Sequence, residues 1–285
     1  MPGDVLDLEL AGLDRLDVAD AAPRSMARRL WRALWPKLAA VGAVVLLWQC
    51  LVWAAWRPEY VLPSPTSVLR RLGHDAATAE FWHAAMYTLR RALVGFAVAL
   101  LIGGTVGIAV ARSRVLRTAV GSMITGLQTM PSIAWFPLAI LLFRLSEQAI
   151  IFVVVLGAAP SVANGIVAGI DSVPPSFHRL ARNLGAGAVA YYRDIVVPAA
   201  MPTVLSGIKQ GWAFSWRSLM AGELLVVIPG TQSIGSRLQF AREFSDAEGL
   251  LATMVVILVI GVVVDAGFGL AERRVLARRG LTSPG

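Results

Sequence analysis

Six long apolar segments constrain the fold of this 285-residue chain more than any other feature. A hydrocarbon core of about 30 Å takes roughly 20 apolar residues per helix, and backbone exposed to lipid has to satisfy its own hydrogen bonds. The runs are continuous rather than alternating, which excludes a β-barrel. The sequence therefore predicts an all-α membrane protein with about six transmembrane helices. The segments are 38–56, 92–111, 119–143, 149–170, 203–228 and 250–270.

Composition and charge agree with a membrane location. Charged residues make up 15% of the chain, against about 25% in soluble domains, and the mean hydropathy is +0.66. The arginines that account for the pI of about 10.7 gather at the ends of the apolar segments. By the positive-inside rule they predict cytoplasmic termini, so the basic balance reflects topology and no nucleic acid partner is expected. The acidic N-terminus does not have the pattern of a cleaved signal peptide.

These features predict the following organisation along the chain. Residues 1–35 form a cytoplasmic acidic tail with an interfacial helix, and 36–56 form the first transmembrane helix. Residues 57–87 form an external segment in which a short helix starts at Pro65. The core spans 88–272 and contains a polar loop at 173–202, and residues 273–285 form a cytoplasmic tail.

The sequence contains no pattern typical of covalent chemistry. Neither lysine, Lys37 or Lys209, ends a G-x-x-x-x-G-K-[ST] loop, so the chain cannot cradle ATP phosphates in that way. A single cysteine, Cys50, cannot form a disulfide or a cluster within the chain. The three histidines lack metal-ligand spacing: His74, His83 and His178. We therefore expect no enzymatic activity, no metal and no cofactor.

Several apolar segments carry residues that are costly in lipid. Pro131 and Pro137 in the third segment predict a kinked helix, which either lines a pathway or is merely bent. Asn164 serves as interhelical glue or as a substrate contact. Arg217 has to pair or face a wet cavity, because an arginine at the bilayer centre costs about 2.5–3.5 kcal/mol even on the lenient scale. We expect it either to line a route for anions or to pair with Asp265.

The polar segment 173–202 separates the fourth and fifth apolar segments. It combines helical patterning with several charged side chains and a central glycine, Gly185, which permits a turn. This pattern predicts a short helix, a turn and a second helix at the membrane surface, with Pro198 in the first turn of the next membrane helix. Such a protrusion can lie in the groove of a partner protein.

The segment resembles the EAA loop of importer permeases of the ATP-binding-cassette (ABC) superfamily, whose pattern is E-A-A-x3-G-x9-I-x-L-P. Ala181, Gly185, Ile195 and Pro198 keep every interval, whereas Arg179 stands where Glu is usual. Leu180 stands where Ala is usual, and Val197 replaces Leu. With PSIAWFPLAILLF, ARNLGA and LPSPTSVL, the chain resembles the nitrate/sulfonate/taurine subgroup of these permeases from about residue 53 to 274.

The resemblance implies a type I (MetI-like) ABC importer permease in a bacterial inner membrane. It also implies two cytoplasmic ABC ATPase subunits, an external substrate-binding protein, a second permease copy and a small anionic substrate moved by alternating access. A stand-alone secondary transporter or channel is the alternative, and a membrane enzyme is a third class. The implied ATPase-coupling residues are Arg179, Leu180, Ala181, Arg182, Leu184, Gly185 and Ala186. The pathway candidates are Met130, Pro131, Ser132, Trp135, Asn164, Trp216, Arg217, Ser218 and Glu223.

Overall fold

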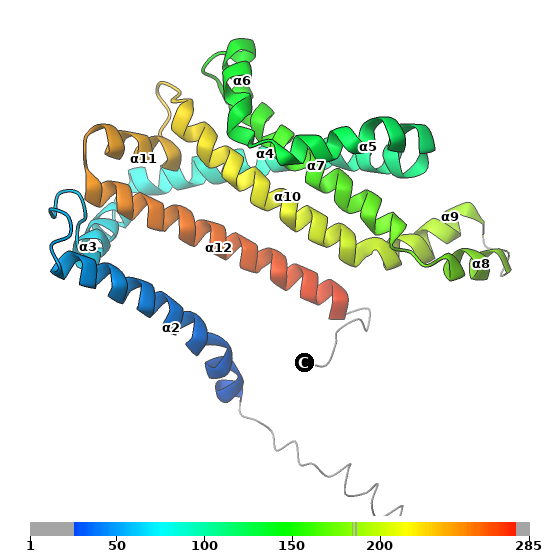
Figure 1. The fold of residues 1–285 in the computed structure, drawn as a ribbon, viewed down its shortest axis with the longest axis horizontal. Coiled ribbons are helices and arrows are strands. Elements are labelled where there is room, and N and C mark those ends of the chain that lie inside the picture. Colours follow the sequence, from blue (N-terminus) through cyan, green and yellow to red (C-terminus); the bar gives the residue numbers. More distant parts are fainter. Residues whose placement is uncertain (1–25, 184, 186, 278–285) are drawn as a thin grey trace, which may run out of the picture. The chain divides into compact units, whose positions relative to one another are not determined.

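The structure is a computed structural model that describes residues 26–183, 185 and 187–277 (Figure 1). The chain divides into two compact units, Met1–Pro65 and Thr66–Gly285. In the first unit, helix α2 (Met26–Trp53) joins the predicted interfacial helix and the first predicted span into one element. In the turn that follows α2, Ala55 has a φ of 49°. The indole N–H of Trp48 in α2 donates to the carbonyl of Pro63, beyond this turn, at 3.1 Å.

In its described residues, the second unit is helical and contains no strand. The helices before the polar segment are α3 (Pro65–Ala76), α4 (Ala79–Arg112), α5 (Arg114–Thr129), the 3₁₀ turn η1 (Ser132–Trp135), α6 (Phe136–Phe143) and α7 (Glu147–Asp171). Those within and after it are α8 (Pro175–Asn183), α9 (Ala188–Tyr191), the π-helical turn η2 (Tyr192–Val196), α10 (Val197–Leu225), α11 (Ile234–Glu243) and α12 (Ala247–Ala277). The helix predicted to start at Pro65 is α3.

The centre of this unit is α7, which packs against both α4 and α10 (Figure 1). Small residues bring the three backbones together: a Cβ added at Gly165 of α7 would lie 2.6 Å from the Cα of Gly207 of α10. On α4, a Cβ at Gly103 would meet the carbonyl of Ala159 at 2.5 Å. Close approach of this kind is how membrane helices associate where the hydrophobic effect gives no net drive. Gly103 of α4 therefore serves packing within the chain.

Four described helices are long and apolar enough to cross a membrane, and a fifth is added if the bent pair α5 and α6 is one span. The four lie at Leu34–Trp53, Ala79–Arg112, Glu147–Asp171 and Ala247–Ala277. Helix α10 has 29 residues and matches the fifth predicted segment, but it carries Lys209, Arg217 and Glu223 and is not among the four. The all-α membrane fold is confirmed, with fewer purely apolar spans than the six predicted.

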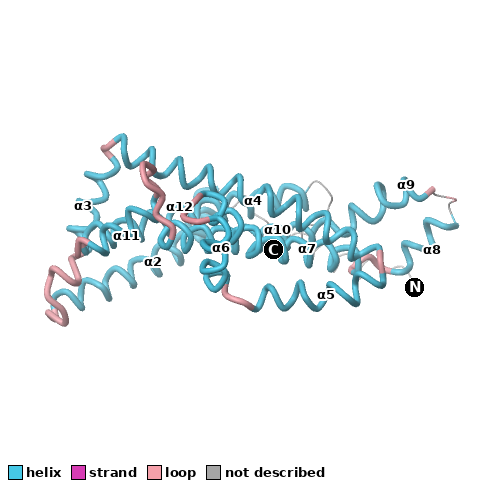
Figure 2. The backbone as a smooth tube through the Cα atoms, turned by 90° about the horizontal axis from the view of Figure 1, so that it is seen from above, coloured by secondary structure: helices cyan, strands magenta, loops and turns pink. Residues whose placement is uncertain are grey.

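The prediction of one kinked helix over 119–143 is wrong in one respect: the chain breaks there, and the two pieces are bent by 102°. In Figure 2 a loop separates the two helices at this point. Met130 is extended, with φ −75° and ψ 131°, because the residue before a proline is driven out of the helical region. Pro137 does not kink a helix but lies in the first turn of α6, where its missing N–H has no helical acceptor to lose.

Candidate functional site

A pocket of about 330 Å³ lies at the break between α5 and α6. Its walls come from the end of α5, the segment of η1, α7 and α10, and four of the predicted pathway residues line it: Met130, Pro131, Ser132 and Arg217. The remaining lining residues are Leu127, Gln128, Thr129, Ile133, Gly157, Phe214 and Ala221. The proline break therefore lies at a hollow that one cationic residue, Arg217, lines.

Arg217 is exposed, and its contacts are with its own helix. Its Nε donates to the carbonyl of Ala213 at 3.2 Å, and its guanidinium lies 4.6 Å from the centre of the Phe214 ring. Within the described ranges no acidic side chain pairs with it. The expected pair with Asp265 is wrong, because Asp265 instead forms an ion pair with Lys209, with Oδ1 and Nζ 3.4 Å apart. Lys209 and Arg217 lie about two turns apart on α10, and the packing of α10 against α12 brings Lys209, not Arg217, to the Asp265 carboxylate.

Asn164 lies behind the pocket wall in a short chain of side-chain hydrogen bonds. Its amide N–H₂ donates to Gln128 Oε1 at 2.6 Å, and Gln128 Nε2 donates to Ser161 Oγ at 2.9 Å. Gln128 itself lines the pocket. The arrangement fixes the end of α5 to α7, so Asn164 acts first as interhelical glue and reaches the pocket only through Gln128.

Three other pathway candidates lie in the core beside the pocket rather than on its wall. Trp216 is 9% exposed and stacks on Trp212 with ring centres 6.4 Å apart, and Trp135 packs against the same cluster. Ser218 is buried, and its hydroxyl has no hydrogen-bond partner among the described residues. A Cβ added at the pocket residue Gly157 would lie 2.5 Å from that hydroxyl.

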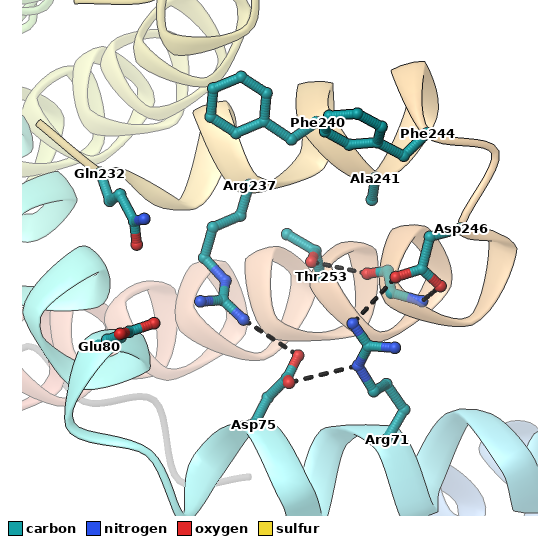
Figure 3. Close-up of a pocket in the computed structure, with 11 residues that line it drawn as sticks. Arg71, Asp75, Glu80, Gln232, Arg237, Phe240, Ala241, Phe244, Asp246 and Thr253 are labelled. Carbon is teal, nitrogen blue, oxygen red and sulfur yellow. Dashed lines mark hydrogen bonds and ion pairs between the residues drawn. The ribbon is translucent and has the colours of Figure 1, made fainter. Parts of the chain in front are cut away.

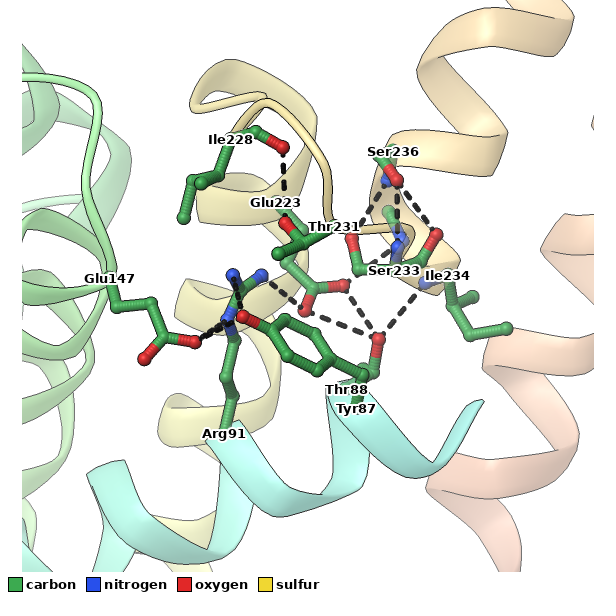
Figure 4. A network of polar contacts seen from close by, with 11 residues as sticks. Tyr87, Thr88, Arg91, Glu147, Glu223, Ile228, Thr231, Ser233, Ile234 and Ser236 are labelled. Carbon is green, nitrogen blue, oxygen red and sulfur yellow. Dashed lines mark hydrogen bonds and ion pairs between the residues drawn. The ribbon is translucent and has the colours of Figure 1, made fainter. Parts of the chain in front are cut away.

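Glu223 is fully buried in a polar network rather than exposed to the pocket (Figure 4). Its carboxylate accepts from Arg91 Nη1 at 3.2 Å, from Thr88 Oγ1 at 2.9 Å and from the N–H of Gly235 at 3.0 Å. Arg91, 5% exposed, also donates to Glu147 at 3.3 Å. The network ties α4, α7, α10 and the start of α11 together. Arg91 is not among the site residues predicted from the sequence, although an arginine in a helix that also crosses lipid has to find a partner.

The polar segment forms the predicted helix, turn and second helix. Helix α8 ends at Asn183, Gly185 has a φ of +66°, and α9 leads through η2 into α10, with Pro198 in its first turn. Arg179 and Leu180 are exposed, whereas Ala181 is buried. The predicted contacts Leu184 and Ala186, and the side chain of Arg182, lie outside the described residues.

A second pocket, of about 230 Å³, lies among α3, α11 and α12 (Figure 3). Arg71 pairs with Asp75 at 3.3 Å and with Asp246 at 2.9 Å, and Arg237 pairs with Asp75 at 3.1 Å. Each arginine in this pocket therefore has a carboxylate partner, unlike Arg217. The part of the chain that the structure describes contains no group of His, Cys, Asp and Glu side chains that could hold a metal.

Residues 95–277 match the family model described as binding-protein-dependent transport system inner membrane component. The chain belongs to this family. The matched range contains the pocket at the break between α5 and α6, Arg217, Glu223 and the helix–turn–helix, whereas Thr88 and Arg91 lie before it. The inner-membrane location is therefore established, and the family is one of transport components.

Relatives agree with the resemblance in the sequence. The chain is 28% identical to the taurine transport system permease protein TauC of Escherichia coli (strain K12), over 87% of this chain and 93% of that protein. It is 26% identical to the putative aliphatic sulfonates transport permease protein SsuC of the same organism, over 81% and 86%. It is 27% identical to the nitrate import permease protein NrtB of Leptolyngbya laminosa, over 83% and 86%. The predicted resemblance to this subgroup is confirmed.

Solved structures confirm the fold class. A chain of the MetNI methionine ABC transporter in an inward-facing conformation superposes with a TM-score of 0.56 at 19% identity, covering 66% of this chain and 92% of that one. A chain of an amino acid ABC transporter gives a TM-score of 0.56 at 18% identity, over 71% and 97%. The fold is therefore that of a MetI-like ABC importer permease.

Proposed function

We propose that this chain is the permease subunit of an ATP-driven, binding-protein-dependent importer for small anions of the sulfonate, taurine or nitrate class. It moves its substrate by alternating access and is driven by a separate ATPase. The printed names of three relatives support this substrate class. The observation that carries the proposal is Arg217, a cation in a membrane helix that lines a pocket without a carboxylate partner among the described residues.

An anion in the pocket balances the charge of Arg217. A charged side chain inside a bilayer has to face a wet cavity or pair with an opposite charge, and the nearest contacts of this guanidinium are neutral. Gln128, Thr129 and Ser132 in the pocket wall offer further polar groups. The volume of about 330 Å³ lies at the lower end of the roughly 300–1,000 Å³ of small-molecule sites, which suits a small solute.

The helix–turn–helix 173–202 is the part of the chain that we assign to the ATPase. Leu180 and Phe177 of α8 are 49% and 38% exposed, and apolar side chains at helical spacing serve as anchors in a partner's groove. Arg179 stands beside them, exposed, where related loops have Glu. We therefore expect an acidic residue opposite Arg179 in the ATPase. A second permease copy and an external substrate-binding protein complete the assembly.

The experiment compares anion uptake by variants of Arg217. The permease, its ATPase and its binding protein are reconstituted in proteoliposomes with ATP, and uptake of labelled taurine, an alkanesulfonate and nitrate is measured. Arg217→Gln is expected to lower uptake at least tenfold, whereas Arg217→Lys, which keeps the charge, retains a larger share. Arg273→Gln, which removes an exposed cation at the end of α12, is the matched control and leaves uptake unchanged. Uptake by Arg217→Gln at the wild-type rate overturns the proposed role of Arg217.

A further inference from the structure

Helix α5 connects the pocket with the end of the chain's core from which the helix–turn–helix projects. Its last residues, Leu127–Thr129, line the pocket, whereas its first turns lie beside the end of α7. Ile124 is its one buried residue within the described chain. A helix with so little buried apolar surface is held loosely by packing and can change position more easily than the interlocked α4, α7 and α10.

Polar contacts hold both ends of α5 to α7. At the pocket end, Gln128 bonds to Ser161 and Asn164, as described above. At the other end, the guanidinium of Arg117 donates two parallel hydrogen bonds to the carboxylate of Asp171, from Nη1 to Oδ2 and from Nη2 to Oδ1, both at 2.9 Å. This two-pronged geometry fixes the relative orientation of the two side chains as well as their distance.

The position of Asp171 at the end of α7 links the Arg117–Asp171 pair to movement of α8. Asp171 is the last residue of α7, and α8 begins at Pro175. A displacement of α8 therefore reaches Asp171 first, and from there Arg117. Since α5 is continuous from Arg114 to Thr129, and a helix rises about 1.5 Å per residue, a shift at Arg117 is carried roughly 20 Å to the pocket wall at Met130.

We propose that the Arg117–Asp171 pair is a positioning pair that transmits movement of the helix–turn–helix through α5 to the pocket that holds Arg217. The inference rests on the proposed function, because the helix–turn–helix moves only if an ATPase binds it. A second link joins the other flank of the same segment to α4: the guanidinium of Arg112 lies 5.2 Å from the ring centre of Tyr192. That link leads into the interlocked core, whereas the Arg117–Asp171 pair leads to the pocket wall.

Because the Arg117–Asp171 pair is exposed, its role in transmitting movement can be measured apart from any contribution to stability. The side chains of Arg117 and Asp171 are 42% and 46% exposed, and exposed ion pairs contribute little to stability. Loss of the pair should therefore leave folding and ATPase binding nearly unchanged. What it should change is the amount of solute moved for each ATP hydrolysed.

The test measures taurine uptake and ATP hydrolysis together in proteoliposomes that contain the full assembly. Arg117→Gln and Asp171→Asn are each expected to lower the uptake-to-hydrolysis ratio at least fivefold, while the melting temperature and the amount of co-purified ATPase stay at wild-type values. The exchange of both residues, Arg117→Asp with Asp171→Arg, is expected to restore at least half of the ratio. Arg114→Gln, at the same exposed end of α5, is the matched control and keeps the wild-type ratio.

Three outcomes overturn the inference. These are a wild-type ratio in both single variants, loss of ATPase binding together with the ratio, and an exchanged pair that does no better than the single variants. The failure of the proposed function looks different: the wild-type assembly then hydrolyses ATP but takes up neither taurine, an alkanesulfonate nor nitrate.

Discussion

Replacing one member of the buried pair of Arg91 and Glu223 should destabilise the core, because the remaining charge loses its buried partner. Glu223 is 0% exposed and Arg91 is 5% exposed. Arg91→Met removes the guanidinium and leaves the carboxylate with two neutral donors, Thr88 and the N–H of Gly235. Removing one member of a buried ion pair costs about 3–5 kcal/mol, so we expect Arg91→Met to lower the free energy of unfolding by that amount.

The opposite substitution should cost less because the network is asymmetric. In Glu223→Gln, the amide oxygen still accepts from Thr88 and Gly235. Arg91 keeps Glu147 at 3.3 Å, whose side chain is 45% exposed and can adjust. The loss is then close to that of one charge-assisted hydrogen bond, about 1.5–3 kcal/mol. The double variant leaves no buried charge alone and should be more stable than the sum of the single losses predicts, by about 1–3 kcal/mol.

The assay is equilibrium unfolding of the purified chain in detergent micelles. Arg90→Met, which changes the exposed neighbouring arginine, is the control and should alter the free energy of unfolding by less than about 0.5 kcal/mol. Losses of the two single variants that add in the double variant to within about 0.5 kcal/mol contradict an energetic coupling of Arg91 and Glu223. A larger loss in Glu223→Gln than in Arg91→Met contradicts the asymmetry of the network.

Two further predictions concern glycines. Gly165→Ala places a Cβ 2.6 Å from the backbone of Gly207 and should lower the free energy of unfolding by about 1–3 kcal/mol. A Cβ at Gly104 meets no atom within 4 Å, so Gly104→Ala should instead raise the free energy of unfolding by about 0.5–1 kcal/mol. Equal effects of Gly165→Ala and Gly104→Ala in unfolding titrations contradict the packing described. Gly185 has a φ of +66° and open space around it, so Gly185→Arg should leave an inserted protein without uptake. Gly185→Ala should reduce uptake more than Gly187→Ala, whose glycine has no positive φ, and equal uptake argues against a role of the turn.

The sequence predicts much of this fold because its signals are local. Apolar runs mark where the membrane helices lie but not where α2 and α4 begin, because both helices start more than ten residues before the predicted segments. Gly185 marks the turn of the polar segment, and Pro131 marks the point at which the third segment is interrupted. Each of these follows from the chemistry of one residue or one short stretch. The size of the break at Pro131 does not, because the angle depends on what α5 and α6 pack against.

The sequence does not identify which charged side chains pair between neighbouring helices. Hydropathy and spacing give no register between α10 and its neighbours. The sequence therefore allows Asp265 to pair with Arg217, whereas the packing of α12 on α10 pairs it with Lys209. The same lack of register hides the pairing of Arg91 with Glu223. One signal in the sequence does point to this pair. Arg91 precedes the second predicted segment and Glu223 lies near the end of the fifth, and with cytoplasmic termini both positions are on the outer side of the membrane. Buried opposite charges at the same depth are the candidates for pairing.

The central claim is that this chain is a gate moved by a separate ATPase, and uptake by proteoliposomes tests it most directly. Labelled taurine, an alkanesulfonate and nitrate are offered to vesicles that contain the chain alone, the chain with its ATPase, or the chain with ATPase and binding protein. We predict uptake of at least one of these anions against its gradient in the complete assembly with ATP, and none when any component is left out. Transport at a comparable rate by the chain alone contradicts the account.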